Sequence, residues 1–310
     1  ESIMIGRFNI DGIDAYEQFG IFIADTGLVG LLQYPALKKV DSNDWPEEDG
    51  EEFDLSEPAL DTKTFQIKFA SHKANRVGAF IEKISDKSYH DFEIPTIKQT
   101  FRLRLTDQQS RVLYSRGETF TLQFADDFPL RGYAYLAPQS TMNRACGYEI
   151  DGIDLGQYGV SILEGSLSEV EKSPAVKQNL LLNFQRESGA IYDGEFVVFK
   201  AKDVNLKCAL RATTAEEFWR NYKALLFDLT RAEERQLYVN KTGYEYPCYY
   251  KSCTSSKFLP MRGRIWWVFD LTLVFTSFRV RGEEYLLASE NGMLIITEDD
   301  QSAINLSIYD

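Results

Sequence analysis

The chain has 310 residues, of which 44% are hydrophobic and 14% aromatic, enough apolar material for two domains of ordinary size. Its formal net charge of −13 argues against a general nucleic-acid binder, because phosphate binding requires clustered lysine and arginine. Apolar runs fall short of the roughly 18 residues that a membrane helix needs, so we expect a soluble protein without a membrane partner.

One sequence pattern occurs twice. Asn-Ile-Asp-Gly-Ile-Asp at 9–14 returns as Glu-Ile-Asp-Gly-Ile-Asp at 149–154. A constant offset of 139 then carries four further segments onto later ones: Gly20-Ile21 onto Gly159-Val160, Pro35–Lys38 onto Pro174–Lys177, Asp49-Gly50 onto Ser188-Gly189, and Phe65–Phe69 onto Val204–Cys208. A register kept from residue 20 to residue 69 predicts two diverged copies of one unit. The expected domains are 1–145 and 146–310, with a linker at about 126–145 that contains Pro129, Gly132 and Pro138.

Each copy begins with a short apolar segment, 8–13 or 148–153, whose Asp-Gly pair predicts a hairpin. The segments 65–69 and 204–208 alternate apolar and polar residues, as half-buried strands do. The apolar spacing then changes to that of a helix, near 74–85 and 215–229. Thr214 and Glu217 form a capping box at the second helix, and an offset that rises from 139 to 145 predicts six extra residues before that helix.

Alternating strands follow each helix, at 101–105 and 120–124 in the first copy and at 267–275 in the second, where 120–124 resembles 271–275. The expected fold class is mainly β with minor α. We predict two tandem antiparallel β-sandwich or barrel domains, each with one packed amphipathic helix. Asn291-Gly292 between apolar runs, followed by Ile304, Leu306 and Ile308, adds a C-terminal β-meander.

The segment 41–57 contains nine carboxylates and no lysine or arginine. Three interpretations stand: an extended solvated loop, a docking surface for a basic partner, and a calcium loop, although the spacing fails the EF-hand pattern at Trp45. The candidate docking residues are Asp41, Asp44, Trp45, Glu47, Glu48 and Asp49, and no metal site is assigned to them.

Aromatic residues cluster at Tyr244, Tyr246, Tyr249 and Tyr250 and again at Trp266-Trp267. We expect core or subunit-interface positions for them, with Tyr249, Tyr250 and Trp266 as candidate contact residues, and a sugar-stacking platform as the alternative. His72 and His90 lack a catalytic context and are expected at surface or capping positions, and Cys208 is expected in the core. The Walker and GxGxxG motifs are missing, which argues against the usual nucleotide-binding folds, and no catalytic residue or cofactor is assigned.

The order of these signals resembles bacteriophage distal tail proteins and related tail-tube domains. The residues that carry the resemblance are 8–14, the step from Tyr16 to Gly20, Ala224–Leu226, Gln236–Tyr238, Glu245–Lys251 and Phe269–Phe275. The acidic loop and the C-terminal meander depart from that pattern. The resemblance implies a non-enzymatic virion tail protein of a phage or prophage, assembled in the bacterial host cytoplasm as a ring beside neighbouring tail-tube and hub proteins. It also implies a trimer with pseudo-sixfold shape, or a hexamer, through which DNA passes without specific binding. A two-domain carbohydrate-binding adhesin is the alternative, and a hydrolase comes third.

Overall fold

The structure, a computed structural model, describes residues 6–277 except 25–26, 73–75, 115–116, 143, 178–180, 187, 190, 193–196 and 262. The predicted C-terminal β-meander therefore lies outside the described residues.

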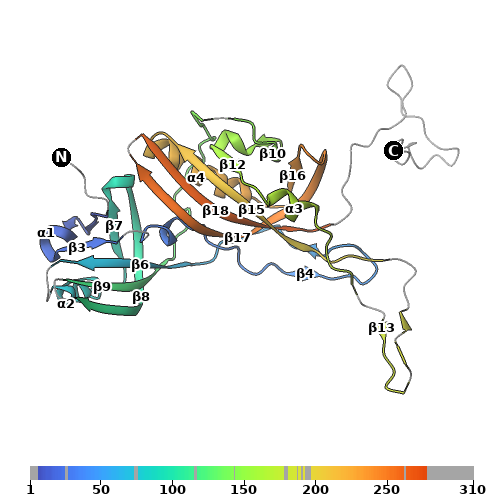
Figure 1. The fold of residues 1–310 in the computed structure, drawn as a ribbon, viewed down its shortest axis with the longest axis horizontal. Coiled ribbons are helices and arrows are strands. Elements are labelled where there is room, and N and C mark those ends of the chain that lie inside the picture. The colour runs from blue at the N-terminus through green and yellow to red at the C-terminus, as the bar shows by residue number, and fades with distance from the viewer. Residues whose placement is uncertain are drawn as a thin grey trace.

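Two seven-stranded antiparallel sheets form the body, one from each half of the chain (Figure 1). The first sheet has the order β2-β1-β7-β8-β9-β6-β3 and the second has the order β11-β10-β16-β17-β18-β15-β12. The first sheet contains β1 (Asn9–Ile10), β2 (Ile13–Asp14), β3 (Ile21–Ile23), β6 (Lys63–Ser71), β7 (His90–Ile94), β8 (Gln99–Tyr114) and β9 (Gly117–Asp126). The second contains β10 (Tyr148–Ile150), β11 (Ile153–Asp154), β12 (Val160–Ile162), β15 (Lys202–Ala212), β16 (Arg235–Val239), β17 (Tyr244–Met261) and β18 (Arg264–Phe275). Corresponding strands take corresponding places, and the predicted β-rich fold class is confirmed.

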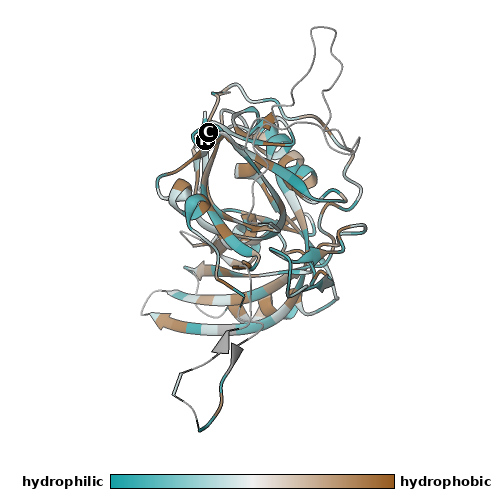
Figure 2. Cartoon of the chain, turned by 90° about the vertical axis from the view of Figure 1, so that its right-hand side faces the viewer, coloured by the Kyte–Doolittle hydropathy of each residue, from teal (hydrophilic) through white to brown (hydrophobic). Residues whose placement is uncertain are grey.

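Each sheet bends over its own core. The first part of β8 pairs with β7 and the rest with β9, and register shifts follow Leu105 and Gln108. β17 also has two shifts, after Tyr250 and Ser255, and the first of them lies at the position equivalent to Leu105. Because bulges bend a strand, the two ends of one sheet come face to face, and the Phe8 ring lies 5.5 Å from the Phe69 ring. Figure 2 shows hydrophobic and hydrophilic residues alternating along the strands, and the burial of β6 alternates in the same way, as predicted for residues 65–69.

The helices also correspond, with one difference in length. The main helices are α2 (Val77–Ile84) and α4 (Ala215–Leu229). The shorter elements are α1 (Ala15–Phe19), α3 (Ser166–Glu171) and the 3-10 turns η1 (Gly30–Leu32), η2 (Pro95–Ile97) and η3 (Leu155–Tyr158). Tyr222 is the counterpart of Val77, yet α4 already begins at Ala215. The six extra residues thus lengthen the helix, and the prediction that they precede it was wrong.

The sheet register corrects one sequence match. Phe65 pairs with Phe124, and Val204, its counterpart, pairs with Leu273. Residues 120–124 therefore correspond to 269–273, two residues earlier than the predicted match. Glu118, opposite Ser71, then takes the place of Trp267, opposite Leu210.

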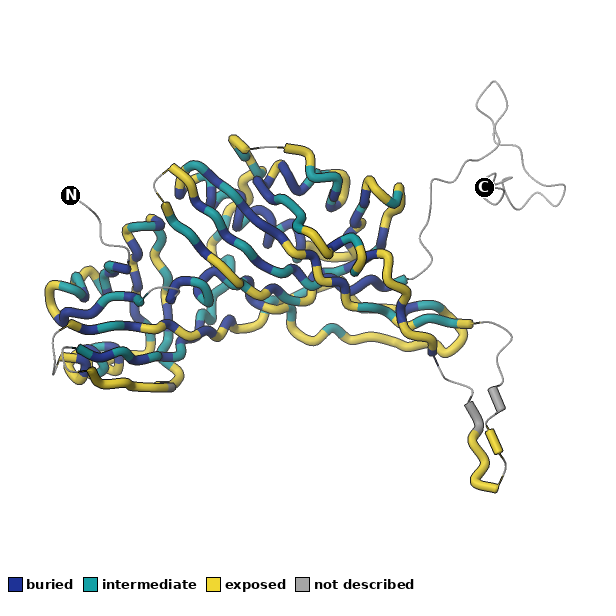
Figure 3. The backbone as a smooth tube through the Cα atoms, viewed as in Figure 1, coloured by how far each residue is buried: buried dark blue, intermediate teal, exposed yellow. Residues whose placement is uncertain are grey.

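A long segment extends from each half, between β3 and β6 in the first half and between β12 and β15 in the second. The first arm (residues 34–60) is closed near its base by the bridge Leu37–Leu60 and contains β4 (Ser42–Asn43) and β5 (Glu52–Phe53). The second arm (residues 173–199) is closed by Val176–Phe199 and contains β13 (Leu181–Leu182) and β14 (Ile191–Tyr192). The first arm runs along the second half, whereas the second arm extends away from the body (Figures 1 and 3).

The segment between β9 and β10 contains no helix or strand among its described residues and lies along α4. Asn221 of α4 accepts a bond from Gln139 N (2.8 Å), and Arg220 donates to Ala137 O (2.7 Å). The predicted linker at about 126–145 and the division into domains at residue 145 both stay predictions.

Candidate functional site

The repeated Asp-Gly motif has a structural explanation. Asp11 and Asp151 have positive φ angles of 51° and 50°, and each precedes a glycine that also has positive φ. The Asp11 carboxylate accepts from Asp91 N (3.0 Å) and contacts His90 Nδ1 (2.8 Å). The Asp151 carboxylate accepts from Gln236 N (2.9 Å) and from Arg235 (2.8 Å). In both halves the aspartate thus ties the hairpin to the neighbouring strand.

The second aspartate of each motif caps a short helical turn. Asp14 accepts from the backbone of Tyr16 and Glu17, and Asp154 accepts from Gly156 N. Gly20 and Gly159 end these turns at φ values of 70° and 72°, where a side chain would be strained. In each copy the motif therefore stabilises the hairpin and the turn that follows it.

Charged groups surround Asp11 and lower the pKa of its carboxyl group. Burial disfavours ionisation of Asp11, but hydrogen bonds from Asp91 N, His90 and Lys87 outweigh it, so the pKa of Asp11 is held well below its usual range. His90 is only 2% exposed. The expectation of a surface or capping role for His90 was wrong, because its ring fills the space beside Asp11.

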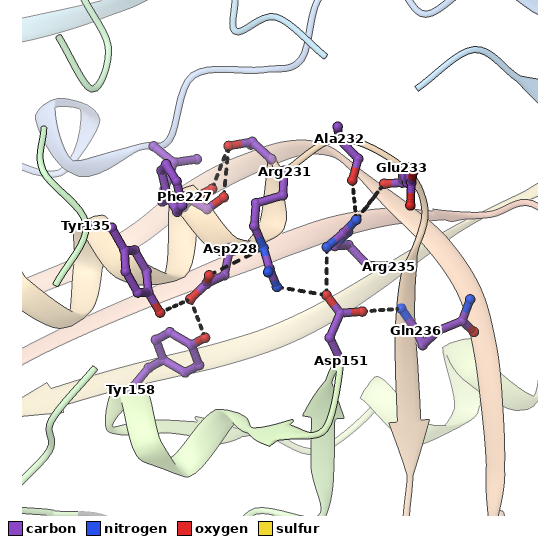
Figure 4. Close-up of polar contacts among 12 residues, drawn as sticks. Tyr135, Asp151, Tyr158, Phe227, Asp228, Arg231, Ala232, Glu233, Arg235 and Gln236 are labelled. Atoms are coloured by element: carbon purple, nitrogen blue, oxygen red, sulfur yellow. Dashed lines mark hydrogen bonds and ion pairs between the residues drawn. The ribbon is translucent and has the colours of Figure 1, made fainter. Parts of the chain in front are cut away.

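In the second half the corresponding charges extend into a larger network (Figure 4). Asp151 accepts from Arg231 and Arg235, and Arg231 also contacts Asp228. Asp228 accepts from Tyr158 (2.7 Å) and Tyr135 (3.0 Å). Burial is the main cause that raises the pKa of both tyrosines, and their hydrogen bonds to the Asp228 carboxylate raise it further. The network joins the linker and η3 to the end of α4.

The acidic loop forms the end of the first arm. Three of its residues, Asp44, Trp45 and Glu48, contact the buried ammonium group of Lys177. Lys177, at the base of the second arm, is 1% exposed. Its Nζ binds Asp44 Oδ1 (2.6 Å), Trp45 O (2.9 Å) and Glu48 O (2.8 Å). A buried ammonium requires such partners, and here two of the three are backbone carbonyls.

Backbone bonds hold the end of the first arm against the second half. Asp49 accepts from Phe199 N (2.9 Å), and Gly50 N donates to Phe199 O (2.8 Å). Gly50 lies so close to Thr276 that a Cβ would overlap Thr276 O, which excludes any other residue. Asp41 O accepts from Asp54 N within the arm, the Trp45 indole donates to Glu52, and Glu47 is exposed. We name residues 44–50 the arm tip.

The candidate aromatic residues do not form a solvent-facing row. Tyr250 is fully buried, and its hydroxyl donates to Pro35 O (2.7 Å) at the start of the first arm. Tyr249 is half-buried against Phe53 of that arm (4.9 Å between ring centroids), and burial raises its pKa to about 12. Trp266 is a half-buried residue of β18, and the Arg211 guanidinium covers its ring at 4.5 Å from the ring centroid. Two of the three candidates therefore contact the first arm.

Sequence analysis missed the residue that anchors the arm. Tyr34 is fully buried among second-half residues, 4.5 Å from the ring of Tyr222 and 5.1 Å from that of Trp267. Its hydroxyl donates to Tyr222 O (2.7 Å), and Tyr222 donates to Leu32 O (3.0 Å). One available signal was that Ser173 replaces Tyr34 in the second copy, immediately before the matched segment Pro174–Lys177. We call the residues around Tyr34 the aromatic socket (Tyr222, Tyr250, Trp267 and Phe269).

The remaining candidates have simple environments. His72 is exposed and stacks on Tyr16 (4.9 Å), and Cys208 is buried as predicted. Within the described ranges no group of three or more His, Cys, Asp or Glu side chains is placed to hold a metal ion. The helices of the described part are too short or too polar to cross a membrane.

Comparisons with known proteins include a distant match to a solved structure. No family model matches the chain, and no curated protein matches it. Among solved structures, the chain is similar to the Dit (gp 19.1) protein of SPP1, described as a paradigm of the hub adsorption apparatus in phages that infect Gram-positive bacteria. The match has 9% identity and a TM-score of 0.31, and it covers 88% of this chain and 99% of that one. A similarity of this size does not establish a shared fold, so the proposals below depend on the residues of this chain.

Proposed function

We propose that the chain is a structural component of a phage or prophage tail, a distal tail or tube-hub protein that forms a ring around the DNA channel. The observation that carries the proposal is internal repetition. One chain contains two sheets of the same strand order, each with an arm, and the first arm already joins the first unit to the second. A unit that binds a copy of itself through an arm is suited to building closed or open assemblies.

The number of units per chain favours a trimer. Two units in each of three chains supply the six similar positions of a pseudo-sixfold ring, and a hexamer of whole chains is the second option. The contact between Tyr34 and the aromatic socket would then be the intrachain version of a contact that recurs between subunits. Neighbouring tail-tube and hub proteins would cover the two faces of the ring.

The charge of the chain is compatible with a DNA channel. The formal net charge is −13. A groove of about 510 Å³ between the first arm and the second sheet is lined by six carboxylates: Glu48, Asp49, Glu51, Glu52, Glu234 and Glu245. An acidic channel wall would repel phosphates and let DNA slide, whereas a basic wall would retain it. We expect no specific DNA binding.

Electron microscopy of concentrated protein tests this proposal. Negatively stained particles should include rings with six similar lobes, and mass measurement should give three chains per ring. A glycan-binding screen addresses the adhesin alternative. Particles that stay monomeric at every concentration, together with specific sugar binding that Tyr249→Ala or Trp266→Ala abolishes, would replace the ring proposal with the adhesin.

A further inference from the structure

The two arms have equivalent bases but different surroundings. In the first arm Lys38 N donates to Ala59 O and Asp61 N to Ala36 O. In the second, Lys177 N donates to Val198 O and Lys200 N to Ala175 O, the same two bonds displaced by 139 residues. The arms are therefore counterparts in structure as well as in sequence.

Of the two arm tips, the first alone has a binding partner within the described part of the chain. The described tip residues of the second arm, Asn183–Arg186 and Ser188-Gly189, are all exposed (Figure 3). Phe184, the counterpart of Trp45, is 49% exposed. Hydrogen bonds from these tip residues to the body are absent among the described contacts.

The first half carries the groups that would receive such an arm. Lys38, the counterpart of the buried Lys177, is exposed and has no side-chain partner among the described residues. Leu60 is the counterpart of Phe199. Its backbone N–H and C=O have no partner in the described structure, whereas those of Phe199 hold Asp49 and Gly50. The receiving groups of the first half are thus unoccupied copies of the ones used in the second.

A hollow lies where the counterpart contact would form. A cavity of about 970 Å³ is lined by Leu60 and Asp127 together with residues of the linker and the end of α4. Asp127 follows β9 as Thr276 follows β18, and Thr276 O accepts from Glu51 N of the docked arm (3.3 Å). The cavity therefore adjoins the counterparts of both backbone segments, Phe199 and Thr276, that hold the first arm tip.

We infer that the second arm docks on the first half of another copy of this chain, with its tip near Lys38, Leu60 and Asp127. This inference rests on the part of the proposed function that makes copies of the chain associate. The contact is heterologous, since the second arm of one copy meets the first half of the next, and it propagates until a ring closes. In it, Lys38 takes the position of Lys177, and Gly189 N donates to Leu60 O as Gly50 N donates to Phe199 O.

The contact between copies should be weaker than the one within the chain. Asn183 replaces Asp44, so the ion pair with the lysine becomes an ammonium–amide hydrogen bond that lacks the opposite charge. Ser173 replaces Tyr34, so no aromatic side chain inserts into the neighbour. A reversible contact of this kind allows folded subunits to form first and to assemble afterwards.

Association measurements on full-length variants test the inference through a gain of function. Asn183→Asp restores the missing carboxylate, and the dissociation constant for self-association, measured by sedimentation velocity, should fall about tenfold because an ion pair replaces an ammonium–amide bond. Lys38→Met should weaken association and should cancel the gain in the double variant. Asp44→Asn, which alters the intrachain contact, should leave association unchanged. An Asn183→Asp effect that persists without Lys38 would overturn the inference.

Cysteine cross-linking in a Cys146→Ser background locates the contact. A chain with Asn183→Cys mixed with a chain with Lys38→Cys should form a heterodimer linked by a short bismaleimide, which spans the length of the lysine side chain that a direct disulfide cannot. As a control, Asp44→Cys and Lys177→Cys should be linked by the same reagent within one chain and not between two chains. Oligomers that form without the Asn183–Lys38 cross-link would refute arm docking and leave the ring proposal standing. A failure of all variants to associate at any concentration would refute both.

Discussion

The two halves share one frame and differ where the arms attach. In the second half, Trp267, Tyr222 and Tyr250 enclose Tyr34 of the first arm. The counterparts in the first half are Glu118, Val77 and Leu105, and Glu118 is paired with Arg111 (2.7 Å). The arm that carries a tyrosine therefore meets an aromatic socket, and the arm that carries Ser173 corresponds to a half without one. The difference teaches that the same arm geometry supports a permanent contact inside the chain and, as proposed, a reversible one between chains.

Removing the anchor should have the largest effect on this comparison. Tyr34→Ala deletes a fully buried ring and its hydrogen bond to Tyr222, and we expect a loss of about 3 to 5 kcal/mol in the free energy of unfolding. Ser173→Ala, the matched change in the second arm, should alter it by less than about 0.5 kcal/mol. Urea denaturation measures both, and similar losses from the two variants would mean that the arms are anchored alike.

Core substitutions test whether the halves are equivalent frames. Phe80 of α2 and Leu226 of α4 are 0% and 2% exposed. Phe80→Ala and Leu226→Ala should each cost about 2 to 5 kcal/mol, because each leaves a cavity between a helix and its sheet. Differential scanning calorimetry should show a lower melting temperature for both. A half that tolerates its substitution would not have the core described above.

The buried Lys63 gives a pH-dependent prediction. Burial lowers the pKa of Lys63 to about 8 from an ordinary value of 10.5. Between these two pH values the unfolded chain therefore binds more protons than the folded chain. The free energy of unfolding accordingly rises as the pH increases from about 8 to about 10.5. Below pH 8 the buried Lys63 lowers the free energy of unfolding by a constant amount. Lys63→Met should remove a deficit of about 2 to 3 kcal/mol at pH 7, reduced by the lost bond to Leu31 O.

Unfolding free energies of the wild type and Lys63→Met, measured by urea titration at several pH values, isolate this effect. The advantage of Lys63→Met should be largest at pH 7 and should shrink toward pH 10. An advantage that grows with pH would have the wrong sign for a lysine whose folded pKa is lowered.

The histidines give the smallest expected difference. His90→Ala removes a buried ring that contacts Asp11, and should cost about 1 to 2 kcal/mol. His72→Ala changes an exposed side chain and should cost less than about 0.5 kcal/mol. Thermal melts of the two variants should separate them by a few degrees. Equal melting temperatures would place His90 at the surface, as the sequence alone suggested.

Much of the fold could be predicted from local sequence patterns. The alternation of Phe65, Ile67 and Phe69 and the helical spacing of Phe80 and Ile84 both identify buried faces, because each depends on periodicity within one element. The capping box at Thr214 was also readable, and Glu217 N does donate to Thr214 Oγ1 (3.1 Å).

Contacts between distant segments could not be read in the same way. His90 lies in a polar stretch, and its burial results from Asp11, which is 79 residues away. The residues 44–48 are hydrophilic by composition, yet the Asp44 carboxylate and the backbone carbonyls of Trp45 and Glu48 surround Lys177, which is more than a hundred residues later. Tyr34 has no periodic neighbours that would mark it as core. Such positions depend on how the two halves meet, and no local pattern contains that information.

Hydrogen–deuterium exchange of the two arm tips, in dilute and in concentrated protein, tests the central claim most directly. The Gly50 amide, bound to Phe199 O, should exchange slowly under both conditions. The Gly189 amide should exchange rapidly in dilute protein and slowly in concentrated protein, where it gains Leu60 O of another copy as its acceptor. A Gly189 amide that exchanges rapidly at concentrations where oligomers are present, or a Gly50 amide that exchanges rapidly in the monomer, would contradict the account.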